Sequence, residues 1–177
     1  AEVPFMRPMD LVSDTARSSD VMAHALQFFS DQKKYYDYVI LLEPTSPLTE
    51  ASDVDAALQM LHKAREQADS IVGVSLVGAT HPDFDVRLGE DGLISPYVTP
   101  DFSSLKRRQD TEPLYFMEGS LYASAVDAFL AKRSFYHERT MGYVVPRWKS
   151  FEVDELIDLI CIEALMARRD ELRALTN

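Results

Sequence analysis

Polar side chains that could bind a ligand follow an apolar run in the first third of this sequence. Residues 38–42 read Tyr-Val-Ile-Leu-Leu, and a loop with two prolines comes next, carrying Glu43, Thr45 and Ser46. Parallel α/β sheets bind ligands at the loops that follow the carboxyl ends of their strands. The prolines would stiffen this loop, and Thr45 and Ser46 would offer hydroxyl groups. The alternative is a rigid strand-to-helix connection whose hydroxyls only cap the next helix.

Charged residues in the second half of the chain also allow two interpretations. Glu152 and Asp154 flank a single valine, and such a pair of carboxylates could bind a metal ion. Aspartate is also a common helix N-cap, and the residues alone favour Asp154 as the cap of a helix over 155–175. Arg108 ends a run of three cations. Its planar guanidinium could bind a carboxylate through two hydrogen bonds, although runs of charge are commonly solvated surface.

The elements that must position these residues alternate between strand and helix. Apolar runs at 38–42 and 70–75 predict buried strands, and the helical stripe between them predicts a right-handed crossover in a mainly parallel sheet. Ser52 and Asp55 have the spacing of a capping box for that helix. Residues 84–98 are expected to form a hairpin, and 101–112 an exposed loop or short helix. Val3 and Phe5 alternate as in a strand, but prolines interrupt the pattern. Further strands are expected at 120–124 and 142–145, and further helices at 21–29, 125–132 and 155–175.

Composition excludes several classes of protein. A length of 177 residues with 46% hydrophobic and 27% charged residues fits one soluble domain. The net charge is 18 − 29 = −11, which argues against nucleic acid and anionic membranes as partners. Cys161 is the only cysteine, so an internal disulfide and a multi-cysteine zinc site are excluded. A cytoplasmic location is therefore expected.

Segments spread over most of the chain resemble, in the same order, motifs of the acylneuraminate cytidylyltransferases, the CMP-sialic acid synthetase family. The matching segments are 7–15 (RPxxLAxD in the family), 41–48 (LLQPTSPLR), 108–110 (RQD), 118–122 (NGAIY), and 152–154 with Asp158 (DIDxxxD). The resemblance implies that a hydroxyl of a nine-carbon 2-keto acid sugar attacks the α-phosphate of CTP, giving a CMP-sugar and pyrophosphate. It also implies Mg²⁺, because cations must offset the charge between an anionic nucleophile and the phosphates.

The resemblance further assigns roles by position. Asp154 is the expected catalytic residue and, with Glu152, the expected metal-ligand pair, while Asp158 is expected to be structural. The nucleotide would lie near Arg7 and Ser18, and the sugar near Glu43, Thr45, Ser46 and Arg108. The implied fold is a single three-layer, Rossmann-like α/β nucleotidyltransferase domain with a mainly parallel sheet. Residues 84–119 would form the arm of a homodimer.

Departures from the family pattern bear on the substrate and on activity. Glu43 replaces a glutamine, Glu118 an asparagine, and Phe116 stands where many members have an arginine. These changes suggest an acid sugar other than N-acetylneuraminic acid, such as legionaminic or pseudaminic acid. The family's glycine-rich basic CTP loop has no counterpart in these residues, so the chain is expected to be truncated at its N-terminal side relative to the family or to be a degenerate member of it. Two alternatives remain: a non-catalytic binding or assembly module of the same fold, and a nucleotidyltransferase for another sugar acid.

Overall fold

A computed structural model describes residues 2–12 and 16–176 of the chain. Its main sheet has the order β1-β5-β2-β6, formed by Tyr38–Leu42, Tyr115–Ala125, Ser70–Leu76 and Thr140–Val144, respectively. β2 pairs in parallel with β6, whereas β5 is antiparallel to both β1 and β2. β1, β2 and β6 therefore run in one direction, and β5 is the strand that makes the sheet mixed.

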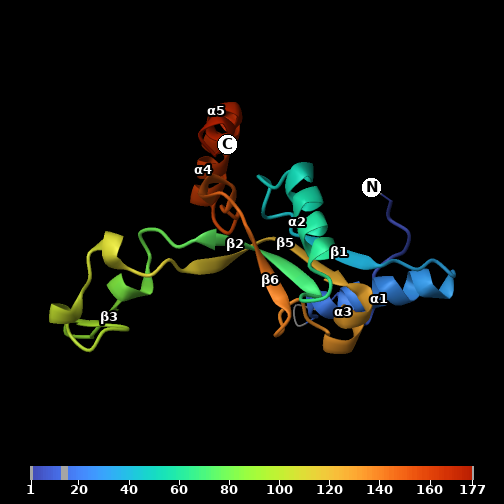
Figure 1. The fold of residues 1–177 in the computed structure, drawn as a ribbon, viewed down its shortest axis with the longest axis horizontal. Coiled ribbons are helices and arrows are strands. Elements are labelled where there is room, and N and C mark those ends of the chain that lie inside the picture. Colours follow the sequence, from blue (N-terminus) through green and yellow to red (C-terminus); the bar gives the residue numbers. More distant parts are fainter. Residues whose placement is uncertain (1, 13–15, 177) are drawn as a thin grey trace.

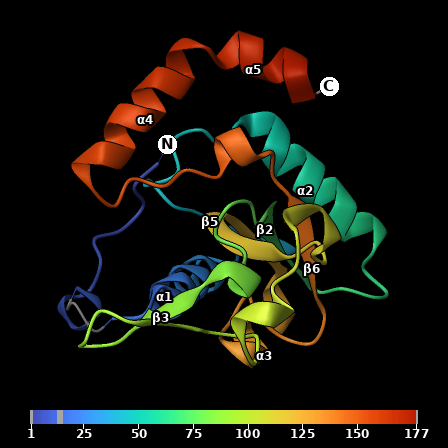
Figure 2. The ribbon, with the colours of Figure 1, turned by 90° about the vertical axis from the view of Figure 1, so that its left-hand side faces the viewer.

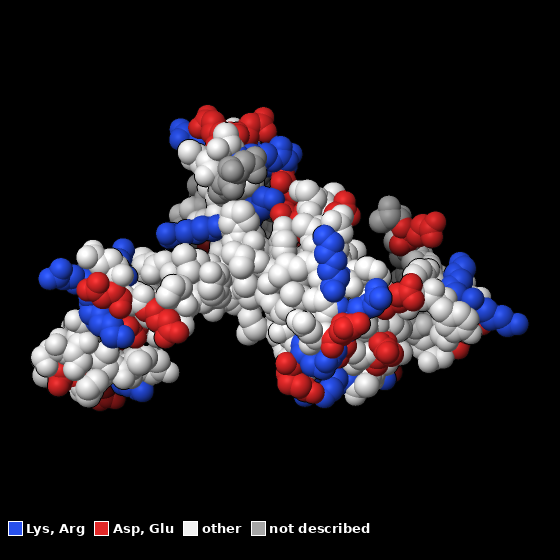
Figure 3. Space-filling view, in the orientation of Figure 1, with Lys and Arg blue, Asp and Glu red and all other residues white. Residues whose placement is uncertain are grey.

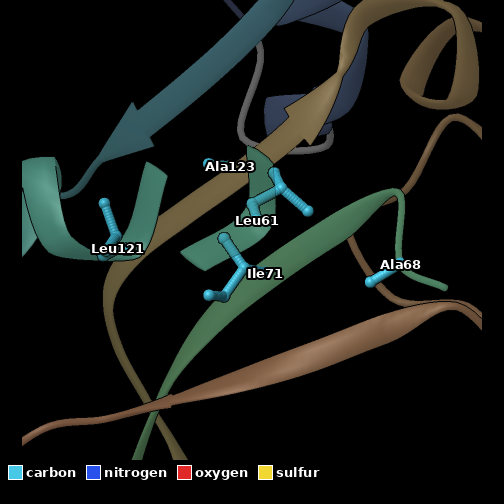
Figure 4. Packing of buried hydrophobic residues seen from close by; sticks show 6 residues of the cluster. Leu61, Ala68, Ile71, Leu121 and Ala123 are labelled. Atoms are coloured by element: carbon cyan, nitrogen blue, oxygen red, sulfur yellow. The ribbon is translucent and has the colours of Figure 1, made fainter. Parts of the chain in front are cut away.

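Helices cover both faces of this sheet, which confirms the expected three-layer α/β architecture. On one face, Ala57 and Leu61 of α2 (Ala51–Lys63) pack with Ile71 and strand β5 (Figure 4). On the other face, Val72 packs with α1 (Ser18–Asp31) and α3 (Val126–Lys132) (Figure 2). Successive strand residues point to opposite faces, so a strand that is covered on both sides reads as a continuous apolar run.

Both predicted helix caps lay at the wrong residues. The capping box of α2 is formed by Glu50 and Asp53, not by Ser52 and Asp55. The Asp53 carboxylate accepts the Glu50 backbone N–H at 2.9 Å, and this starts the helix at Ala51. In the same way, Glu155 is the N-cap of α4, the helix for which Asp154 was the expected cap.

The long C-terminal helix expected over 155–175 is divided into two. α4 spans Leu156–Ala167, α5 spans Arg169–Thr176, and Arg168 separates them. Figure 2 shows that the two axes differ in direction. The change of direction allows the Arg169 and Arg173 side chains of α5 to reach Glu50, at the start of α2.

The expected hairpin projects from the body as an arm (Figure 1). β3 (Val86–Leu88) pairs with β4 (Ile94–Pro96), and Gly92 in the turn has a φ of 79°. Residues 101–112 contain two short 3₁₀ helices, η3 (Phe102–Ser104) and η4 (Arg108–Asp110). Two others are η2 (Pro82–Phe84), before the hairpin, and η5 (Arg147–Lys149), after β6. The role of the arm in a homodimer stays a prediction.

Prolines interrupt the strand-like alternation of the N-terminal segment. Residues 3–5 form no strand; instead, the Phe5 ring packs against His24 and Phe28 of α1. A 3₁₀ helix, η1 (Met9–Leu11), follows. Residues 13–15, the end of the first matching motif, lie outside the described residues.

Figure 3 shows acidic and basic side chains interspersed on one face of the molecule. In the part of the chain that the structure describes, no helix is both long and apolar enough to cross a membrane.

Candidate functional site

The loop after β1 and the segment before α4 meet beside the sheet. The Ser46 hydroxyl donates to a Glu152 carboxylate oxygen at 3.2 Å, and the Val153 N–H donates to the Thr45 carbonyl at 2.8 Å. Leu48, which is 2% exposed, packs with Trp148 and so anchors the loop. Two of the predicted site residues, Ser46 and Glu152, are thus in direct contact although they are 106 positions apart.

Glycines allow carboxylates to approach the backbone at this point. The register between β2 and β5 shifts between Val72 and Val74, so β5 carries extra residues there. Gly119 lies in this irregular stretch with a φ of 78°, a conformation that favours glycine. A Cβ atom at Gly119 would overlap the Glu152 carboxylate, and one at Gly73 would overlap that of Glu118. The sequence therefore leaves room for two carboxylates at one irregular stretch of sheet.

Glu118 is a buried carboxylate within this stretch. Glu118 is only 1% exposed, and one of its carboxylate oxygens accepts hydrogen bonds from the hydroxyl and the backbone N–H of Ser120. The other oxygen is buried and has no partner among the described residues. Burial raises the pKa of Glu118, and the charge of nearby Glu152 raises it further. The site thus contains an acceptor oxygen that a ligand or cation could satisfy.

Four acidic residues influence one another here, and we refer to Glu43, Glu118, Glu152 and Asp154 as the acidic cluster. Burial raises the pKa of Glu152, and the negative charges of Asp154 and Glu43 add to that increase. Asp154 is exposed, and its backbone N–H donates to Asp158 at 3.1 Å. A cavity of about 490 Å³ beside the cluster is lined by Glu43, Ser46 and Ser120, among others. Such a cluster favours a cation or hydrogen-bond donors as its ligand.

The acidic cluster can be tested for its fit to Mg²⁺. Among the described residues, no three His, Cys, Asp or Glu side chains are arranged to hold a metal ion. Mg²⁺ commonly binds through one or two carboxylates and keeps several waters. Glu152 and Asp154 offer such a pair, and the unpartnered oxygen of Glu118 provides a further acceptor nearby. The described residues therefore supply oxygen donors of the kind that a partly hydrated magnesium ion uses, but not a three-residue metal site.

A buried lysine holds the segment that leads to Glu152. Lys149, in η5, is 7% exposed, and its ammonium group lies 2.8 Å from Glu50 and 2.7 Å from Asp53. Arg173 also donates to Glu50. Hydrogen bonds from Arg173 and then Lys149 lower the pKa of Glu50 to about 2. This network ties the start of α2 to the chain just before the acidic cluster.

The other predicted residues lie on different elements. Arg108, in η4 of the arm, lines a separate cavity with Arg147. Arg7 is exposed in the N-terminal segment, and Ser18 is exposed as the first residue of α1. The Thr45 side chain is exposed, and only its carbonyl bonds to Val153. In the described residues, the structure therefore gathers the loop and the acidic residues but leaves Arg7, Ser18 and Arg108 apart.

Sequence reasoning did not identify two groups at this site. Glu118 was noted only as a departure from the family pattern, and its burial beside Ser120 was not predicted. The available signal was a carboxylate followed by two small residues inside an apolar strand, since small residues leave space for a buried charge. Lys149 was overlooked because its partners, Glu50 and Asp53, are almost a hundred residues away.

Comparison with known proteins agrees with the motif resemblance. No protein-family model matches the chain. The chain is 30% identical, over 88% of its length, to the N-acylneuraminate cytidylyltransferase of Streptococcus agalactiae serotype V, and covers 35% of that protein. It is 28% identical, over 97% of its length, to the CMP-N,N'-diacetyllegionaminic acid synthase of Legionella pneumophila, of which it covers 72%. The chain is homologous to the acylneuraminate cytidylyltransferases. The predicted resemblance is thereby confirmed.

Two further comparisons extend this result. The pseudaminic acid cytidylyltransferase of Campylobacter jejuni serotype O:2 is 25% identical over 90% of the chain, which covers 66% of that protein. A solved structure of a CMP:2-keto-3-deoxy-manno-octonic acid synthetase complexed with CTP shares the fold, with a TM-score of 0.53 and 16% identity over 88% of this chain and 70% of that one. The chain spans about a third of the length of the streptococcal cytidylyltransferases that it matches.

Proposed function

We propose that this chain provides the site at which CMP is transferred from CTP to a sialic-acid-like 2-keto acid sugar, with release of pyrophosphate. The observation that carries the proposal is the meeting of Ser46 and Glu152, because it joins two family-like motifs at one cavity. The relatives named above are N-acylneuraminate, legionaminic acid and pseudaminic acid enzymes, which supports this reaction class.

Within this proposal, Asp154 and Glu152 hold Mg²⁺. When bound, the ion offsets negative charge on the phosphates of CTP. Asp154 suits this role because its exposed carboxylate is not used as the helix cap, which Glu155 supplies. Glu152 is held in position by the Ser46 hydroxyl and by its packing against Gly119.

The remaining predicted residues bind the two substrates in this proposal. Glu43 and Ser46 line the cavity beside the acidic cluster and contact hydroxyl or amino groups of the sugar, together with Thr45 in the same loop. Carboxylates accept hydrogen bonds from such groups. Arg108, which lies on the arm and apart from the acidic cluster of its own chain, binds the acid group of the sugar when the arm reaches the site of a second copy. Arg7 and Ser18 lie near the nucleotide. The carboxylates of Glu43 and Glu118 favour a sugar that presents hydroxyl or amino groups to them.

The arm suits an interface in a homodimer. Leu88, Leu93 and Tyr97 are large apolar residues of the arm that are each more than half exposed. Exposed apolar groups gathered on a projecting hairpin are commonly covered by a partner. We therefore propose that two copies associate through the arm, which light scattering at micromolar concentration would detect.

The test of the function is pyrophosphate release by the protein that contains these residues, with CTP, Mg²⁺ and a panel of acid sugars. The panel holds N-acetylneuraminic, legionaminic, pseudaminic and 2-keto-3-deoxy-octonic acids. Asp154→Asn should lower turnover about 100-fold or more, since removing one electrostatic group from a reaction centre commonly has this effect. The circular dichroism spectrum should not change.

Asp127→Asn is the matched control, because Asp127 is equally an exposed aspartate but lies on α3. It should leave turnover unchanged, and a chelator should abolish turnover of the wild type. Equal rates for Asp154→Asn and the wild type would exclude the metal role. Absence of turnover with every sugar would favour the non-catalytic alternative.

A further inference from the structure

Helix α4 leaves most of its apolar residues uncovered. Of the 12 residues in Leu156–Ala167, Ile162 is the only buried one. Leu156 and Ile157 are 73% and 58% exposed, and Ile160 is 53% exposed. A helix that is apolar around most of its circumference is normally buried. α4 therefore has the sequence of a covered helix, but the described residues do not cover it.

The uncovered residues form one continuous stripe. Positions three and four apart lie on the same side of a helix. The exposed apolar residues of α4 that recur at this spacing are Ile157, Ile160, Cys161, Ala164 and Ala167, and we refer to them as the α4 face. None of them is charged. Contiguous apolar surface of this kind on a soluble protein commonly marks an interaction site.

A hollow lies beside the second half of this face. Its volume is about 560 Å³, and it is lined from both sides of the break between α4 and α5. Cys161, Ala164 and Leu165 of α4 line it, together with Leu172 of α5. Arg168, at the break itself, is the only charged residue in the lining. The hollow therefore suits large apolar side chains from a partner.

The two halves of α4 are complementary to each other. The first half carries the large exposed side chains of Leu156, Ile157 and Ile160, whereas the second half carries small residues and the hollow. If a second copy of α4 ran antiparallel about a two-fold axis near Cys161, the large residues of each copy would face the hollow of the other. A two-fold interface makes every such contact twice. The shape of this helix thus favours a second copy as its partner.

The charges at the two ends of α4 favour the same arrangement. Its N-cap is Glu155 and its first turn carries Asp158, whereas Arg168 stands at its C-terminal end. Among the described residues, the exposed Arg168 side chain has no carboxylate partner. Antiparallel pairing brings the acidic end of each helix to the basic end of the other and opposes the two helix dipoles. An anionic membrane is a poorer occupant, because the chain has a net charge of −11.

We propose that the α4 face binds the α4 face of a second copy, in antiparallel orientation, with Ile157 and Ile160 of each copy in the hollow of the other. Figure 1 shows that α4 and α5 project from the body in a different direction from the arm, so this interface is separate from the one proposed for the arm. A stable interface needs about 800 Å² from each partner, so α5 and the hollow must contribute beside α4. Two different two-fold interfaces in one chain give a closed tetramer.

Sedimentation velocity at micromolar concentration tests the interface in the protein that contains these residues. Ile157→Glu should halve the mass of the wild-type assembly, whether or not the arm also associates. It should weaken association about 10-fold or more, because the interface would bury an unpaired carboxylate. Glutamate in the first turn does not disfavour the helix itself, and circular dichroism should confirm that the variant is folded.

Leu93→Glu is the matched control, because Leu93 is 70% exposed but lies on the arm. Cys161, the only cysteine of the chain, supplies a second measurement that does not depend on the arm. A short bis-maleimide should join two copies through Cys161 in the wild type and in Leu93→Glu. The yield of joined copies should fall about 10-fold in Ile157→Glu, as the association does.

Equal masses and equal cross-linking yields in the wild type and Ile157→Glu would refute the interface. A wild type that binds phosphatidylcholine vesicles, and loses that binding in Ile157→Glu without a change in mass, would assign the α4 face to lipid and overturn the proposal. None of these measurements uses turnover, so the outcome is independent of the proposed function.

Discussion

Replacement of the buried lysine by an uncharged side chain of similar length should strongly destabilise the protein. In Lys149→Met, the carboxylates of Glu50 and Asp53, whose side chains are 13% and 9% exposed, would face each other without the ammonium group between them. Breaking a buried ion pair by removing one partner costs about 3–5 kcal/mol. Glu50 keeps Arg173, and Asp53 keeps the Tyr143 hydroxyl at 3.2 Å, so we expect a loss near the lower end, about 3 kcal/mol. For a domain of this size, that corresponds to a fall in Tm of about 6–12 °C.

Urea unfolding followed by circular dichroism would measure this free energy, and Lys132→Met is the matched control. Lys132 lies 2.8 Å from Glu138, the same distance as Lys149 from Glu50, but the two side chains are 49% and 69% exposed. An exposed pair contributes about 0–1 kcal/mol, so the control should change little. If Lys149→Met cost no more than Lys132→Met, burial would not be what makes this pair important, and the reasoning would be wrong.

Two other predictions follow from the site and its supporting network. Gly119→Ala should destabilise more than Gly92→Ala, because both glycines have a φ near 80° but only a Cβ at Gly119 meets a carboxylate, that of Glu152. Backbone strain alone costs about 1–3 kcal/mol in either variant. If urea unfolding showed the same loss of unfolding free energy for both, the contact between the Cβ atom and Glu152 would not matter. The pKa of Glu50 is lowered from 4.5 to about 2 in the folded state, so the unfolded chain binds the proton more readily. Ionised Glu50 therefore stabilises the fold fully above about pH 4.5. This contribution, about 3 kcal/mol, is lost as the pH falls towards 2. Glu50→Gln should flatten that part of the stability curve, and an unchanged slope between pH 4.5 and 2 would refute it.

Most of the layered fold could be predicted from local patterns. The apolar runs at 38–42 and 70–75 are strands of the sheet, and residues 86–96 form the expected hairpin. These patterns are strong because a strand covered on both faces needs apolar residues throughout. The place of β5 was not predicted, since its antiparallel insertion between β1 and β2 depends on pairing between distant residues.

The candidate site likewise combines features that local motifs predict with features that they do not. The Ser46 loop and the Glu152 pair carry local motifs, and their contact follows from the order of the strands. The buried state of Glu118 depends on a register shift and on the space above Gly73, which no local pattern encodes. Arg147 was not singled out either, because its partner in the cavity, Arg108, belongs to another segment of the fold.

The error in the helix cap bears directly on the role of Asp154. From residues alone, aspartate before an apolar helical stretch is best explained as an N-cap, and that explanation competes with metal binding. In the structure, Glu155 and Asp158 form the capping box, with the Asp158 carboxylate accepting the Glu155 N–H at 2.8 Å. The Asp154 side chain is therefore not needed to begin α4, and it remains exposed beside Glu152, whose pKa its charge raises. Among the described residues, Asp154 thus caps no helix, and its charge repels that of the partly buried Glu152. A cation bound between the two carboxylates would replace this repulsion with attraction.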